Sequence, residues 1–192
     1  MLTQSVSDLQ LVAMYRNGNQ PAFAELLNRH KDRVYTAIFL LVKDEILAED
    51  LFQDTFIKVI ENLRQGKYSE KGRFLPWVLR IAHNLCIDYF RRTSRMPKIV
   101  TRDGVDIFSI LQFADDRADK TMSHHETSIV MRDLIAQLPE EQREVLILRH
   151  YADLSFKEIA TITDVSINTA LGRMRYALLN MRKMIAEQQI VF

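Results

Sequence analysis

The sequence predicts an all-α protein of two small helical domains joined by a linker. Hydrophobic residues make up 47% of the 192 residues, which is enough to bury sizeable cores. The chain has only five glycines and four prolines, a composition that favours long helices over a turn-rich β architecture. Its length also exceeds what one minimal core needs. We therefore expect domains over residues 1–95 and 127–192, with the linker over residues 96–126.

Four helices are predicted in the first domain. They cover about residues 8–16, 21–41, 44–63 and 75–94. Asn17-Gly18-Asn19 stops the first helix, and Pro21 suits the first turn of the second. Asp44 is placed to cap the third helix, and Pro97 bars extension of the fourth.

The second domain begins after a stretch without a sustained helical period, residues 98–126. Helices are then predicted over about residues 127–137, 139–151, 155–162 and 166–188. Ser155 and Glu158 have the spacing of a capping box, in which each side chain satisfies a backbone N–H at the helix start. Ser166 is placed to cap the last helix.

Charge is unevenly distributed along the chain. Residues 64–102 carry ten Lys or Arg against two acids, whereas residues 103–126 carry six acids against two bases. A basic block in a chain whose net charge is only +1 indicates a local site for a polyanion. An ordinary solvated helix face explains the charge equally well at this point.

The fourth helix separates its side chains by face when residues advance by 100°. An apolar stripe is predicted to face the core: Val78, Ile81, Ala82, Leu85 and Tyr89. The other face holds cations, an amide, an indole and one apolar residue, with an imidazole alongside: Trp77, Arg80, Asn84, Ile87, Arg91 and Arg95, with His83. The loop before the helix adds three cations and two aromatic rings: Lys67, Lys71, Arg73, Tyr68 and Phe74. Cations among aromatic rings suit single-stranded nucleic acid, although Phe74 and Trp77 have the alternative of packing as core beneath the loop.

The last two helices have the layout of a helix-turn-helix, joined by the short turn Thr163-Asp164-Val165. An apolar stripe of the second helix is predicted to face inward: Ile167, Leu171, Met174, Leu178, Met181 and Ile185. The opposite face is polar: Asn168, Thr169, Gly172, Tyr176 and Lys183, flanked by Arg173 and Arg175. Amides and arginines match base edges, hydroxyls and cations take phosphates, and a glycine permits close approach of the backbone. An ordinary helical hairpin remains the alternative.

Five segments resemble the sigma-70 family of RNA polymerase sigma factors. They are residues 48–56 (AEDLFQDTF), 74–84 (FLPWVLRIAHN), 138–146 (LPEEQREVL), 154–160 (LSFKEIA) and 166–177 (SINTALGRMRYA). The first two are similar to the family's region two and the others to region four. A chain holding only these regions resembles the extracytoplasmic-function (ECF) group. Asn168 and Ala170-Leu171-Gly172 depart from the residues usual in the family's recognition helix.

The resemblance implies a factor that binds core RNA polymerase, at its clamp coiled coil and flap, and reads promoter DNA as duplex and as single strand. The residues it implies for polymerase binding are Asp50, Leu51, Gln53, Asp54 and Phe56. Those for the minus-ten element are Lys67, Lys71, Arg73, Phe74, Trp77, Arg80, His83, Asn84, Arg91 and Arg92. Those for the minus-thirty-five element are Ser166, Asn168, Thr169, Gly172, Arg173, Arg175 and Tyr176. An anti-sigma factor is a further expected partner, and the acids of the polymerase-binding set would suit a merely solvated face as well.

No catalytic constellation is present, so we expect neither enzyme activity nor a cofactor. His124-His125 has no further ligand at metal spacing, and Cys86 borders the core stripe, which favours a structural role. A single cysteine, no secretory signal and no apolar run of 18 residues lead us to expect a cytoplasmic protein without membrane insertion.

Two other classes of protein compete with this interpretation. A free-standing helix-turn-helix regulator would bind palindromic duplex without polymerase, but it would leave the Trp77 face without a role. A helical interaction protein would make no DNA contact at all, and its binding would lack the salt dependence of phosphate contacts.

Overall fold

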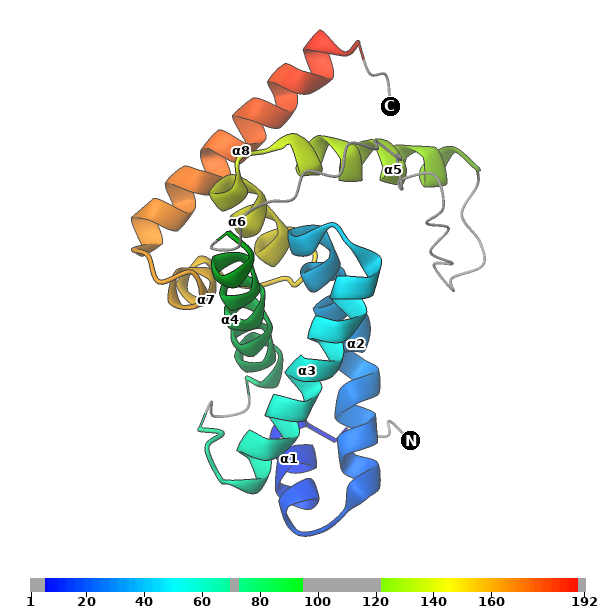
Figure 1. The fold of residues 1–192 in the computed structure, drawn as a ribbon, viewed down its shortest axis with the longest axis vertical. Coiled ribbons are helices and arrows are strands. Elements are labelled where there is room, and N and C mark those ends of the chain that lie inside the picture. Colours follow the sequence, from blue (N-terminus) through cyan, green and yellow to red (C-terminus); the bar gives the residue numbers. More distant parts are fainter. Residues whose placement is uncertain (1–5, 70–72, 95–121, 190–192) are drawn as a thin grey trace.

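Eight α-helices make up the described parts of the chain (Figure 1). A computed structural model describes residues 6–69, 73–94 and 122–189. The helices are α1 (Asp8–Arg16), α2 (Gln20–Val42), α3 (Glu45–Arg64), α4 (Phe74–Ser94), α5 (Met122–Gln137), α6 (Glu140–His150), α7 (Phe156–Ile162) and α8 (Ile167–Glu187). No strand occurs in these three stretches, so the predicted all-α class is confirmed. We call α1–α4 the N-terminal bundle and α5–α8 the C-terminal bundle.

Local signals fix the starts of the first helices. The Asn19 side chain accepts the Ala22 backbone N–H at the start of α2, and Pro21 lies in the first turn, where its missing donor costs nothing. Asp44 accepts the Leu47 N–H at 2.9 Å, so its predicted role as the cap of α3 is confirmed. Lys43 lies between α2 and α3 in the left-handed region, at φ 58°, which ends α2 sharply.

The core of the N-terminal bundle lies between α2, α3 and α4. Val34 and Ile38 of α2 and Val59 of α3 are fully buried, and Val78 of α4 packs with them. In Figure 1, α2 and α3 run side by side with α4 beside them and α1 at the far end. The two long helices α2 and α3 thus hold the basic helix α4 by burying its apolar side.

The C-terminal bundle contains the predicted helix-turn-helix. Ser155 and Glu158 form the expected capping box at α7, and the Ser166 hydroxyl accepts the Thr169 N–H at 3.0 Å at α8. Helix α5 starts at Met122, earlier than the predicted 127. The intervening residues include neither glycine nor proline, so nothing in the backbone stops the helix from starting there.

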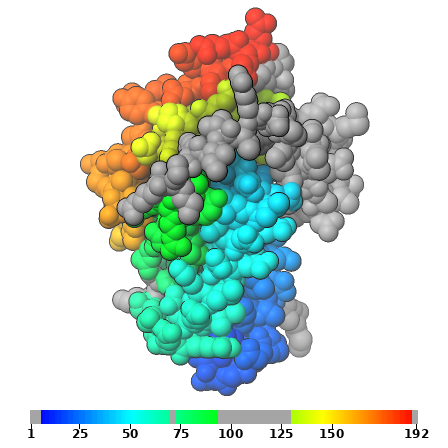
Figure 2. Space-filling view, viewed as in Figure 1, coloured from blue at the N-terminus to red at the C-terminus, as the bar shows by residue number. Residues whose placement is uncertain are grey.

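The two bundles contact each other directly. Helix α6 packs on α2, and α7 packs on α4. Figure 2 shows the yellow and orange atoms of the C-terminal bundle lying against the green atoms of α4. The sequence did not predict this arrangement, and it changes the exposure of several predicted site residues.

Candidate nucleic-acid and polymerase interfaces

The outward face of α4 is polar and basic. Asn84, Arg91 and Arg92 are exposed and Arg80 is half-buried, so the predicted stripe has an accessible part. Lys67, in the loop before α4, is also exposed. Lys71 lies outside the described residues. Three arginines and an amide on one rigid helix form a surface suited to phosphates and to polar base edges.

Phe74 and Trp77 are core residues in this structure. Their exposed fractions are 1% and 6%, so the expectation of an exposed indole on α4 is wrong, and the alternative of packing beneath the loop is confirmed. The Trp77 ring lies 4.8 Å from the Tyr68 ring and 5.9 Å from that of Phe74, measured between centroids. An aromatic cluster between loop and helix gains more from burial than one exposed indole gains from solvent contact.

The buried side of α4 is also shifted around the helix from the predicted stripe. Ile81 and Leu85 are only half-buried and Tyr89 is exposed, whereas Leu79 and Cys86 are fully buried. The reason is that α4 is packed by α2 and α3 and also by α7, so the buried arc extends toward the C-terminal bundle. Helical periodicity locates an apolar stripe but does not reveal a second partner on the flank.

His83, predicted on the DNA-binding face, is buried at the contact between the bundles. Its Nε2 is hydrogen-bonded to a carboxylate oxygen of Glu144 in α6. The other carboxylate oxygen of Glu144 lies 3.9 Å from Nη1 of Arg173 in α8. A buried carboxylate requires such partners, since an unpaired charge away from water is strongly disfavoured.

Arg73 makes a second ion pair between the bundles. Its Nη2 lies 2.7 Å from Oε1 of Glu158, while Oε2 of the same carboxylate completes the capping box of α7. The Arg73 side chain is 60% exposed, so the pair is reached by water and contributes little free energy by itself. Glu158 therefore caps its own helix and binds a residue predicted to contact DNA.

The predicted recognition helix α8 presents part of its polar face. Asn168, Thr169, Arg175 and Tyr176 are exposed. Ser166 is exposed, but its hydroxyl is engaged as the helix cap. These positions lie on the first three turns of α8, where a recognition helix contacts base edges.

Two further members of the α8 set are half-buried, Gly172 and Arg173. A Cβ added at Gly172 would meet nothing within 4 Å among the described atoms, so the glycine leaves open space at the helix surface. Arg173, in contrast, faces Glu144.

The predicted inward stripe of α8 is partly wrong. Ile167, Leu171 and Leu178 are exposed, whereas Met181 is buried as predicted, together with Ala170 and Ala177, which lie outside the predicted stripe. Small residues allow α8 to cross α6 and α7 closely, and this rotates the contact line away from the larger leucines. The exposed apolar residues therefore flank the polar face.

Helix α3 carries the candidate polymerase surface. Asp50, Gln53 and Asp54 are exposed as expected, but Leu51 and Phe56 are buried core residues and are not available to a partner. Two residues that the sequence interpretation missed lie in their place: Ile46 is 76% exposed and Ile57 is 53% exposed. The positions 46, 50, 53 and 57 repeat at helical spacing, which was the signal available in the sequence. We call Ile46, Asp50, Gln53, Asp54 and Ile57 the α3 stripe.

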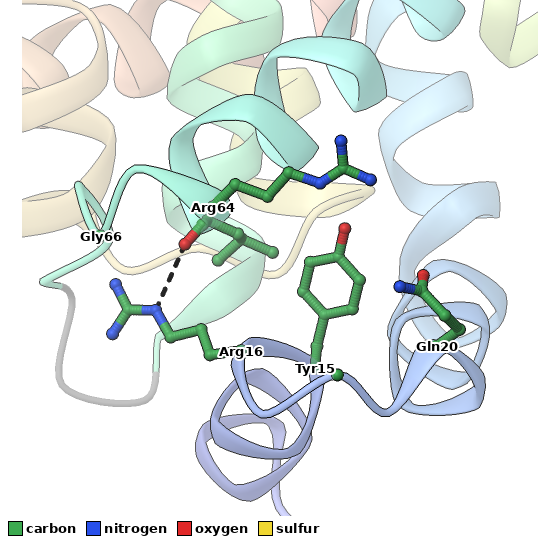
Figure 3. Close-up of a pocket in the computed structure, with 7 residues that line it drawn as sticks. Tyr15, Arg16, Gln20, Arg64 and Gly66 are labelled. Carbon is green, nitrogen blue, oxygen red and sulfur yellow. Dashed lines mark hydrogen bonds between the residues drawn. The ribbon is translucent and has the colours of Figure 1, made fainter.

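A shallow cavity of about 340 Å³ lies at the far end of the N-terminal bundle (Figure 3). Arg16 of α1 and Arg64 of α3 extend along it, and Tyr15 and Gln20 also line it. Nε of Arg16 donates to the Leu63 carbonyl at 3.4 Å, so this cation satisfies the C-terminal end of α3. None of the predicted site residues lines the cavity.

Within the described stretches no helix has the length and apolar character needed to cross a membrane. In the same stretches no three His, Cys, Asp or Glu side chains are grouped to hold a metal ion. The side chains of His124 and His125 lie outside the described residues.

Comparison with known proteins matches both bundles. The family model described as sigma-70 region 2 matches residues 26–96, and that of sigma-70 region 4 matches residues 128–178. The RNA polymerase sigma factor CarQ of Myxococcus xanthus is 30% identical over 176 residues, which cover 92% of this chain and 96% of that protein. The ECF sigma factor SigW of Bacillus subtilis is 25% identical over 92% of this chain and 95% of its own length.

A solved structure shares the fold. The sigma factor RpoE of Bartonella quintana, in complex with the anti-sigma factor NepR, aligns with a TM-score of 0.67 at 21% identity. The alignment covers 85% of this chain and 96% of that one. Two region models in the right order, together with relatives matched along nearly their full length, establish that this chain belongs to the ECF group of the sigma-70 family and is a promoter-directing sigma factor.

Proposed function

We propose a division of labour among three helices of this sigma factor. The α3 stripe docks on core RNA polymerase, the outward face of α4 holds the unpaired strand of the minus-ten element, and the polar face of α8 reads the minus-thirty-five duplex. The observation that carries the proposal is that three accessible surfaces of different chemistry lie on three separate helices.

The α3 stripe has the composition of a protein-binding surface. Ile46 and Ile57 are large apolar side chains left in water, and Asp50, Gln53 and Asp54 lie between them. Apolar anchors provide binding energy when they are buried, and the acids favour a basic partner and steer its approach. A polymerase coiled coil with a basic or polar surface fits this pattern.

The α4 face suits the backbone and polar edges of a single strand. Arg91 and Arg92 are exposed near the end of the helix, with Asn84 and Arg80 preceding them. Phosphates bind to the guanidinium groups, while the amide hydrogen-bonds to an unpaired base. Because the Trp77 ring is buried, we assign it the role of supporting the loop rather than that of a stacking platform.

The α8 face suits the major groove. Asn168 and Arg175 carry the amide and guanidinium groups that recognise base edges, and Thr169 and Tyr176 offer hydroxyls to phosphates. The open space around Gly172 allows the helix to approach the DNA closely. An anti-sigma factor is a further proposed partner, because the structurally similar RpoE is held by one.

Transcription with core polymerase tests the proposal. We expect the protein to bind core polymerase in a pull-down and to start transcripts at discrete sites on genomic DNA, which mapping of their 5′ ends would reveal. Asp50→Asn combined with Asp54→Asn should weaken polymerase capture, whereas the matched variant Asp32→Asn, an exposed acid on α2, should not. Failure to bind core polymerase, with palindromic duplex bound tightly in its absence, would favour a free-standing regulator instead.

A further inference from the structure

The Asp8 carboxylate joins the first turn of α1 to the middle of α2. Its Oδ2 lies 2.7 Å from Nε2 of His30, and its Oδ1 lies 3.3 Å from Nη1 of Arg29. A carboxylate only accepts hydrogen bonds, so Nε2 of the imidazole is the donor. The His30 and Asp8 side chains are 14% and 21% exposed, which shields this bond from most of the solvent. The bond therefore fixes the orientation of the His30 ring.

The His30 ring also contacts the aromatic cluster beneath the loop before α4, which consists of Tyr68, Phe74 and Trp77. Its centroid lies 5.5 Å from that of Phe74, the first residue of α4, with 40° between the ring planes. The Phe74 ring in turn lies 6.1 Å from that of Tyr68 and 5.9 Å from that of Trp77, again between centroids. One imidazole thus connects Asp8 with the rings that anchor the loop and the start of α4.

We propose that His30 is a positioning residue for promoter opening. Asp8 orients its ring, and the ring holds Phe74, so that the start of α4 and the loop around Tyr68 stay where the unpaired strand of the minus-ten element must meet them. The proposal rests on the proposed function, since it assumes that α4 and the loop before it hold that strand. His30 itself makes no DNA contact in this scheme, because its ring is engaged with Asp8 and Phe74.

Position 30 makes two demands on its side chain, a hydrogen-bond donor for Asp8 and a flat ring for Phe74. Glutamine keeps a donor but has no ring, whereas phenylalanine keeps a ring but has no donor. A binding surface needs its groups held within about 0.5 Å of the productive geometry, so the loss of either contact should be felt on α4 in a protein that is still folded. Simple core filling would make only the second demand, and phenylalanine would then serve as well as histidine.

Promoter opening by the holoenzyme tests the positioning role. Permanganate reactivity of unpaired thymines would be measured at a mapped start site with His30→Gln, His30→Phe and Asp8→Ala. We expect opening to fall about tenfold in each variant, the scale of losing one hydrogen bond to a charged group or one aromatic contact. Capture of core polymerase should stay at the wild-type level, because the α3 stripe is unchanged. The control is His150→Gln, the same substitution at an exposed histidine of α6, which should open the promoter as the wild type does.

Trp77 supplies a spectroscopic readout, since it is the only tryptophan of the chain. In the free protein we expect acrylamide to quench Trp77 fluorescence more strongly in His30→Gln and Asp8→Ala than in the wild type, because a released Phe74 loosens the cluster of rings. Circular dichroism melts would verify that each variant is folded at the temperature of the measurement. A purely stabilising role would lower the melting temperature and leave the quenching of the folded protein unchanged.

Wild-type opening in folded His30→Phe and Asp8→Ala would overturn the proposal and reduce His30 to core filling. A loss of polymerase capture in step with the loss of opening would overturn it too, since the effect would not be confined to the DNA surface. A wild-type holoenzyme that opens no promoter would refute the proposed function and this proposal with it. A wild type that opens promoters, with variants at His30 and Asp8 that open them equally well, would refute the positioning role alone.

Discussion

The thiol of Cys86 lies inside the N-terminal bundle with 1% of its surface exposed. Burial raises its pKa to about 12, above the value of about 8.5 for a free cysteine. The folded protein holds the proton of the Cys86 thiol more tightly than the unfolded chain does. The contribution of this thiol to the free energy of unfolding is therefore fully present below about pH 8.5. It is lost progressively as the pH rises from there toward about 12.

We therefore expect the free energy of unfolding to fall with pH more steeply in the wild type than in Cys86→Ala. Urea titrations of both proteins between about pH 7.5 and 10.5 would measure the difference. The tyrosines contribute equally to the pH dependence of the free energy of unfolding in the two proteins, so their contribution cancels in the comparison. Parallel pH profiles for the two proteins would contradict the assignment. We also expect the buried Cys86 thiol to be alkylated slowly in the folded wild type and faster in urea, where the thiol is exposed.

Trp77 is predicted to be a stability residue. Replacing it with alanine should cost about 3–5 kcal/mol, the usual range for a large aromatic side chain removed from a core. Trp77→Phe should cost less because it keeps a ring against Tyr68 and Phe74. Chemical denaturation followed by circular dichroism would measure both. A fully stable Trp77→Ala protein that fails only in promoter opening would restore the stacking role.

At the scale of the helix, α4 allows a test of phosphate binding. Arg91→Ala and Arg92→Ala should each reduce the salt dependence of single-strand binding by the holoenzyme. The slope of log K against log salt should become shallower by about 0.7 for each phosphate that the variant no longer binds. Binding isotherms on one oligonucleotide at several salt concentrations give this slope. Lys183→Ala, an exposed cation of α8, is the matched control. If the wild type and the three variants give equal slopes, neither Arg91 nor Arg92 binds a phosphate of the single strand.

Helix starts were predictable because each depends on a few neighbouring residues. Asp44, Ser155 and Ser166 cap their helices as their sequence positions predict. The faces of the same helices were less predictable. Which side of α8 is buried depends on Ala170 and Ala177, whose small size matters only once α6 and α7 are in place.

At the scale of the molecule, the all-α class and the helix-turn-helix followed from periodicity and caps, but the contact between the bundles did not. His83 and Glu144 are 61 residues apart in the chain, and neither helical periodicity nor helix capping indicates that they are partners. The resemblance predicts that Leu51 and Phe56 lie on a partner surface, but tertiary packing places them in the core. The sequence therefore located the correct helices and left open which of their residues face outward.

Small-angle scattering provides a test on the whole molecule. A compact chain of this length has a radius of gyration of about 16 Å. If the contacts at Lys43 and Glu144 hold the bundles together, combining Lys43→Asn with Glu144→Gln should enlarge the radius of gyration by several ångströms, since separated domains scatter as an extended pair. Glu141→Gln should match the wild type. Identical curves for the wild type and the double variant would mean that apolar packing between α2 and α6, and between α4 and α7, keeps the bundles closed without these polar contacts.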